Sequence, residues 1–125
     1  MQIDYTATRS IKSGHSVDTA YTITIGVAKF DRTPVFAGVE HRSLSGSTVT
    51  VTHRNDIVYT IVTQRVETTT TPDRDDMREF LDSVKNGEEF DIDSVTCVLD
   101  SAKAPYTETR EAPDHYSYTF KARVV

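Results

Sequence analysis

Histidine is the first residue type to consider for chemistry, because its imidazole binds metal ions and moves protons near neutral pH. The chain has four: His15, His41, His53 and His115. No two stand at i, i+2 on a strand or i, i+4 on a helix, the spacings that place two ligands on one face. His15 is expected to be solvated in a turn. His41 and His53 approach each other only across a hairpin turned at 45–47, as polar residues on a solvated face. The histidines therefore predict no metal site.

Two acidic runs, at 73–76 and 88–93, are the next candidates. The first lacks the ligand pattern of a calcium-binding loop and is typical of the start of a helix, where negative charge complements the macrodipole. In the second, acidic residues alternate with Phe90 and Ile92. This alternation predicts the outward face of a strand rather than a pair of catalytic carboxylates.

The sequence supports no catalytic nucleophile either. The stretch 43–47 contains Ser-Gly-Ser, but Gly-x-Ser-x-Gly is not met and no helix follows it. Cys97, the single cysteine, lies in an alternating apolar run and is expected to be a small buried residue. No nucleophile, base and oxyanion hole come together. The sequence predicts a protein that is not an enzyme and needs no cofactor.

Length and charge limit the class of protein. A chain of 125 residues supports one core, so a single domain over 1–125 is expected. The net charge of −5 argues against a protein that binds nucleic acid, because such binding needs clustered Lys and Arg. No apolar run approaches the ~20 residues of a membrane span, and the start lacks the features of a signal peptide. A soluble protein made in the cytoplasm is predicted.

The elements that must position these residues are mostly strands. Apolar and polar residues alternate in short runs, with turn signals at 45–47 and 54–56. This pattern predicts an antiparallel β-sandwich or barrel. The expected strands are 5–8, 20–30, 39–44, 48–53, 57–66, 89–93, 95–99 and 115–125.

One segment, 72–86, carries every helix signal. Thr71 or Asp73 can cap it, Pro72 suits its first turn, and Asn86-Gly87 can end it in a left-handed cap. A single apolar stripe at i, i+3, i+4 and i+7 is expected to pack on the sheet: Met77, Phe80, Leu81 and Val84.

Two stretches, 28–38 and 101–113, are predicted to be long loops, the second with a possible ragged edge strand over 106–110. Both mix apolar residues with charge, and long irregular loops in a small domain are commonly functional. The candidate assembly residues in them are Phe30, Val35, Phe36, Ala104, Pro105 and Tyr106.

Four stretches in this order resemble the small tail-tip proteins of long-tailed bacteriophages, the distal tail and minor tail proteins. They are His53-Arg-Asn-Asp-Ile-Val-Tyr59, Asp76-Met-Arg-Glu-Phe-Leu-Asp-Ser-Val84, Gly87-Glu-Glu-Phe90 and the closing strand 116–125. The resemblance covers most of the chain, but its motifs are diffuse and carry no catalytic signature. The carbohydrate-binding module of longer members is absent, so only the ring-forming domain is expected.

The resemblance implies a virion structural protein that forms a hexameric ring between the tail tube and the tip hub. Its implied partners are copies of itself, the tube protein, and the hub or tape-measure protein. DNA would only pass through the lumen, and no membrane is involved. The chain is thus expected in the virion tail, after synthesis in the host cytoplasm.

Two other classes stay open. One is a different phage tail-tube, neck or tail-completion protein, because tube-type folds also combine a β-sandwich with one helix. The other is a non-viral β-sandwich binding module or small enzyme. A stable monomer in solution would favour this last class over any ring.

Overall fold

The structure is a computed structural model of the chain. It describes residues 1–42, 48–100 and 104–125, without the side chains of 36–42 and 48–55. Eight strands and one helix are present in this part: β1 (Gln2–Thr6), β2 (Ala20–Thr24), β3 (Val27–Arg42), β4 (Thr48–Thr63), α1 (Arg74–Val84), β5 (Phe90–Ile92), β6 (Val95–Leu99), β7 (Tyr106–Ala112) and β8 (His115–Val124). The predicted fold class, mainly β with one helix, is confirmed.

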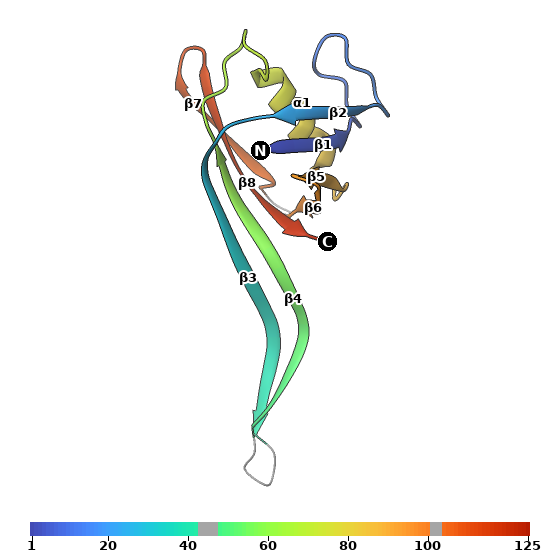
Figure 1. The fold of residues 1–125 in the computed structure, drawn as a ribbon, viewed down its shortest axis with the longest axis vertical. Helices are drawn as coiled ribbons and strands as arrows, with labels where there is room; N and C mark the ends of the chain where they lie inside the picture. The colour runs from blue at the N-terminus through green and yellow to red at the C-terminus, as the bar shows by residue number, and fades with distance from the viewer. Residues whose placement is uncertain (43–47, 101–103) are drawn as a thin grey trace.

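The strands form one antiparallel sheet in the order β2-β1-β5-β6-β8-β4-β3, with β7 also paired to β8. β1 and β2 run across the long axis of the molecule, whereas β3, β4 and β8 run along it (Figure 1). We call β2, β1, β5 and β6 the transverse wing, and β3, β4, β8 and β7 the longitudinal wing. The pairing of β6 with β8 joins them at one corner. At the other, the chain passes directly from β2 to β3 through Ile25 and Gly26.

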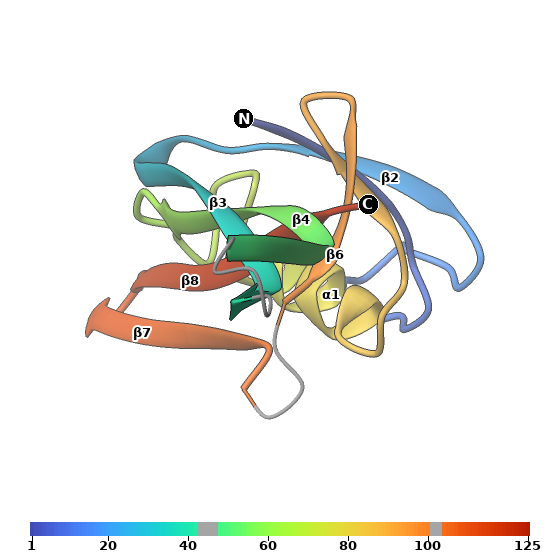
Figure 2. The same ribbon diagram turned by 90° about the horizontal axis from the view of Figure 1, so that it is seen from below.

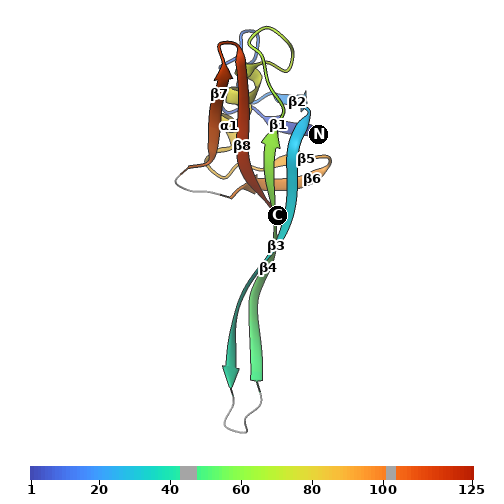
Figure 3. The same ribbon diagram turned by 90° about the vertical axis from the view of Figure 1, so that its left-hand side faces the viewer.

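β3 and β4 form a hairpin of two 16-residue strands that extends far beyond the rest of the sheet (Figure 3). Its register runs from Val27 opposite Thr63 to Arg42 opposite Thr48, whereas β8 pairs only with residues 58–62 of β4. The predicted loop over 28–38 is therefore wrong, because these residues are a paired strand. The predicted turn at 54–56 is wrong as well. The chain stays extended there, and a register shift between Ala37 and Gly38 absorbs the irregularity.

The helix starts two residues later than predicted and ends two residues earlier. Asp73 is the N-cap, and it forms a capping box with Asp76 in which each side chain accepts the other's backbone N–H. The left-handed cap is confirmed at Gly87, whose φ is 94°. Two of the acidic residues at 73–76 thus have structural roles.

The predicted helix stripe is confirmed as core: Met77, Phe80, Leu81 and Val84 are all fully buried. The Phe80 ring contacts Tyr5 of β1 at 5.2 Å between centroids, Phe90 of β5 at 5.1 Å and Phe120 of β8 at 5.9 Å. The helix therefore lies between the two wings and holds them together, as the view from below shows (Figure 2).

Candidate assembly surface

The outer edge of β3 is one boundary of the sheet. No strand in the described ranges pairs with it, and its side chains from residue 28 to 35 are exposed. Phe30 is 43% exposed, with its ring 4.8 Å from that of Tyr59 on β4 between centroids, and Val35 is 38% exposed. Two large apolar side chains thus lie on an open strand edge. Such an edge is a template for pairing with another chain.

Pro34 occurs in this edge strand without interrupting it. The register continues through Pro34 opposite Ile57 to Ala37 opposite Arg54. Proline has no N–H to donate, so within sheets it is tolerated at edges. Its presence limits how a partner strand can pair across the middle of β3.

β7 is the second boundary of the longitudinal wing. It pairs with β8 from Tyr106 opposite Phe120 to Ala112 opposite His115, and its other edge pairs with no described strand. The predicted loop over 101–113 is thus mainly a strand, as the edge-strand alternative allowed, while residues 101–103 lie outside the described part. Of the candidate residues here, Ala104 is exposed and Pro105 half-buried.

Polar contacts fasten β7 to α1. Arg78 of α1 donates two hydrogen bonds to Glu108, at 2.6 and 2.9 Å, and Tyr118 donates a third to the same carboxylate at 2.6 Å. Tyr106 donates to Asp82 of α1 at 2.7 Å. The strand is therefore fixed in position while its outer edge remains available.

The two remaining apolar candidates also lie on β3. Val35 pairs with Asp56, and the backbone of Phe36 lies opposite Asn55 in the projecting hairpin. The side chain of Phe36 lies outside the described residues. The structure places Phe30, Val35 and Phe36 along one edge strand, whereas Ala104, Pro105 and Tyr106 lie at the start of β7.

A polar cluster that the sequence did not reveal surrounds Glu79 in the middle of α1. Glu79 is fully buried and accepts a hydrogen bond from the Tyr5 hydroxyl at 2.8 Å. His15 contacts the same carboxylate through Nδ1, and its ring stacks on Tyr21 at 3.9 Å. The expectation of a solvated His15 is wrong. Its contact with Glu79 spans 64 residues of sequence, so no local pattern could have indicated it.

The other histidines do not gather around a site. His41 pairs with Val49, and His53 lies in the irregular stretch opposite Ala37 and Gly38, so the two are offset along the hairpin. His115 Nδ1 lies 4.0 Å from a carboxylate oxygen of Glu67. Within the residues described, no group of three or more His, Cys, Asp or Glu side chains is placed to hold a metal ion.

The second acidic run, at 88–93, shows the predicted alternation of exposed acidic and buried apolar residues. Phe90 and Ile92 are each 2% exposed, while Glu89 and Asp93 are exposed. Cys97 is fully buried, and burial raises the pKa of its thiol to about 11, so little thiolate forms at neutral pH.

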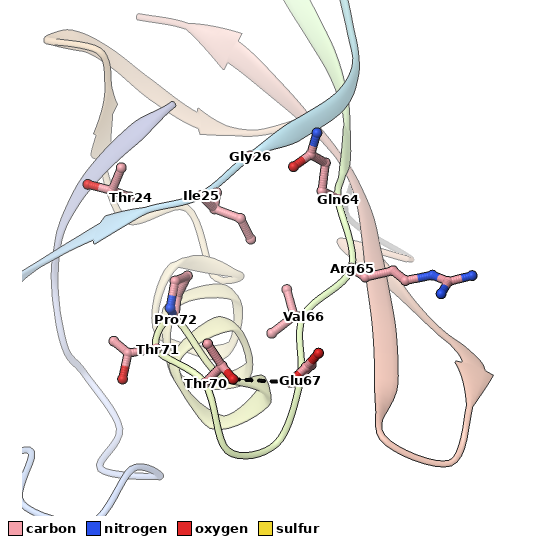
Figure 4. Close-up of a pocket in the computed structure, with 10 residues that line it drawn as sticks. All are labelled: Thr24, Ile25, Gly26, Gln64, Arg65, Val66, Glu67, Thr70, Thr71 and Pro72. Atoms are coloured by element: carbon pink, nitrogen blue, oxygen red, sulfur yellow. Dashed lines mark hydrogen bonds between the residues drawn. The ribbon is translucent and has the colours of Figure 1, made fainter.

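A pocket of about 180 Å³ lies at the corner where β2 passes into β3 (Figure 4). Ile25 and Val66 point into it, and Arg65 points away. The end of the Gln64 side chain occupies the space beside Gly26, where a Cβ would lie 2.1 Å from its oxygen, so a larger residue at position 26 would need this exposed side chain to move. Ligand pockets commonly measure about 300–1,000 Å³, so this corner is better explained by strand packing than by binding.

The one helix in the described part of the chain, α1, is not long and apolar enough to cross a membrane. No protein-family model matches the chain, and no curated protein sequence matches it.

Proposed function

We propose that the chain is a structural subunit of a bacteriophage tail, which assembles into a closed ring at the distal end of the tail tube and has no catalytic activity. One observation carries the proposal. The longitudinal wing presents two available edges, β3 and β7, on opposite sides of the same four strands. An edge on each side lets identical copies pair edge to edge.

Closure follows from symmetry. A contact between different surfaces of identical copies gives a ring if the rotation closes. Four strands from each of six copies make a wall of 24 strands. At about 4.8 Å per strand this wall measures about 115 Å around, roughly 35 Å across between backbones. Such a bore would admit a DNA duplex.

The face of the longitudinal wing turned away from α1 fits the lining of such a bore. Alternation with the buried Tyr118 and Phe120 places Ser117 and Thr119 on this face, and their partners Thr107 and Thr109 lie beside them. These side chains are short and uncharged. Farther along β8, the same alternation places Lys121 and Arg123 on this face, and Arg123 lies 4.0 Å from Asp56 and 3.9 Å from Asp100. The uncharged part of the lining is therefore the stretch around Ser117 and Thr119, within a chain whose net charge is −5.

The projecting hairpin supports assembly rather than catalysis. Two-stranded ribbons are only marginally stable alone in water, so an extension of this length is typical of a segment that packs on another molecule. In a tail, the tube above the ring or the hub below it would be that molecule. A tube or neck protein would use the same features, and the position of the chain in the particle decides between these assignments.

The proposal is tested on purified virions. Mass spectrometry of gradient-purified particles should detect the chain in the tail fraction, in about six copies per tail. Its absence from virions, or its recovery with the capsid shell alone, would exclude a tail ring.

A further inference from the structure

Residues 8–19, here called the strap, lie between β1 and β2 and are bound to α1 through Glu79, Ser83 and Asp76, with Glu79 at the centre. One carboxylate oxygen, Oε1, accepts the backbone N–H groups of Ile11 at 3.1 Å and Lys12 at 3.3 Å. The other, Oε2, accepts the Tyr5 hydroxyl and contacts His15 Nδ1. Three of these four partners belong to the strap. A carboxylate with this many donors is stable as the anion, because a proton on either oxygen would displace a donor.

The remaining strap contacts are also polar. Thr8 exchanges two hydrogen bonds with Ser83 of α1, at 3.1 and 2.9 Å, and the Lys12 ammonium pairs with Asp76 at 2.7 Å. Apolar burial contributes little, because the large apolar side chains of the strap are 39% and 48% exposed: Ile11 and Val17. The strap is therefore held mainly by charge and hydrogen bonds, together with the stacking of His15 on Tyr21 and backbone hydrogen bonds between its last residues and Ala7.

Charged and titratable groups surround Glu79 on each element packed near it. They are Tyr5 on β1, Lys12 and His15 on the strap, Tyr21 on β2, and Asp73 and Asp76 on α1. Burial opposes ionisation of Glu79, but the hydrogen bonds from His15, Tyr5 and Ile11 outweigh it and hold its pKa below the usual value. The anion is therefore favoured at neutral pH.

We propose that Glu79 pins the strap, and that the strap detaches from α1 as one unit when this carboxylate loses its charge, while the sheet and the helix stay folded. Local openings of this kind occur in segments with few buried apolar contacts. Acid is the natural trigger, below the usual carboxylate range. Detachment would uncover the Tyr21 ring and the Tyr5 hydroxyl. This detachment is a property of the isolated chain and is independent of the proposed tail ring.

The test is amide hydrogen exchange of the purified full chain, expressed as protection relative to the unstructured rate. In Glu79→Gln the amides of Ile11 and Lys12 should lose at least about tenfold in protection at pH 7, because a carboxamide cannot replace an anion among four donors. Amides of the β1–β2 ladder, such as Ile3, should keep theirs. Unchanged protection of the strap, or loss only in step with the ladder, would overturn the proposal.

Glu108→Gln is the matched control, because the Glu108 carboxylate also accepts several charged or hydroxyl hydrogen bonds but lies on β7 and accepts them from α1 and β8, not from the strap. In this variant the strap amides should stay protected, and loss of their protection would overturn a specific role for Glu79. If Glu79→Gln does not fold, hydrogen exchange of the unaltered chain is measured instead, at a series of pH values from about 7 to about 3. Protection of the strap amides should fall at a higher pH than protection of the β1–β2 ladder. A simultaneous fall would contradict the proposed detachment of the strap.

Discussion

Arg78 of α1 and Glu108 of β7 form a two-point ion pair, with Nε 2.6 Å from one carboxylate oxygen and Nη2 2.9 Å from the other. Parallel hydrogen bonds of this kind fix orientation as well as distance. The pair joins the only helix described to the strand whose outer edge we assign to assembly. This carboxylate therefore adds to the β8 pairing and the Tyr106–Asp82 bond in fixing the position of β7.

Glu108→Gln should lower the free energy of unfolding by about 1–2 kcal/mol at pH 7, because Arg78 loses its charged acceptor. Hydrogen bonds from Arg78 hold the pKa of Glu108 below its usual value. A folded-state pKa below the unfolded one gives stability that is complete above the unfolded pKa and is lost as pH falls through the folded pKa. Urea unfolding from about pH 7 to about pH 3 should show the difference between variant and parent shrinking with acid. A constant difference would contradict this role.

Phe80→Ala should cost about 3–5 kcal/mol, because the ring is fully buried among three other aromatic rings from both wings. Thermal or urea unfolding measures it. Ile11→Ala is the control, since Ile11 is 39% exposed and its truncation should change stability by less than about 1 kcal/mol. Equal effects of the two substitutions would contradict the central position of the helix.

Tyr5→Phe should destabilise the fold by about 1–3 kcal/mol, because it removes a hydroxyl donor from the buried anion of Glu79 and leaves the ring in place. Tyr106→Phe removes a similar bond, to Asp82, at a half-buried position. The loss should be smaller there, since water can replace the donor. Urea midpoints of the two variants test this order, and the reverse order would count against the importance of the Glu79 cluster.

Phe30→Lys should weaken assembly at least about tenfold while the monomer stays folded, because a charge on the open edge of β3 opposes pairing with another strand. Val17→Lys is the matched control: Val17 is also exposed, at 48%, but lies on the strap. Light scattering over a concentration series, together with circular dichroism, separates assembly from folding. Equal assembly of both variants would remove β3 from the interface.

Local pattern predicted the helix well. The stripe from Met77 to Val84, the cap at Asp73 and the end at Gly87 are all set by residues within one or two turns of each other. The alternation around Phe90 and Ile92 likewise predicted a half-buried strand. In these places the residues that decide the structure are close in sequence.

The long hairpin was not predictable in the same way. Pro34, Gly38 and Arg54-Asn55-Asp56 are residue types that commonly end strands, and the last three were interpreted as a turn. Pairing between β3 and β4 overrides them: proline is tolerated at the edge, and the register shift next to Gly38 accommodates an extra residue of β4.

The candidate surface was predicted in part. Exposure of Phe30 and Val35 agrees with a role at an interface, but they lie on a strand edge rather than in a loop. Tyr106 begins an edge strand and bonds to α1. Removal of 104–112 would therefore delete β7 together with the Arg78 pair and is expected to destabilise the fold.

Averaged density of the intact tail tests the central claim most directly. We expect six copies of this chain in one ring at the distal end of the tube, with β3 of each copy beside β7 of the next and the hairpin in contact with a neighbouring ring. Density that places the chain in the capsid shell, or a tail that lacks it, would contradict the account.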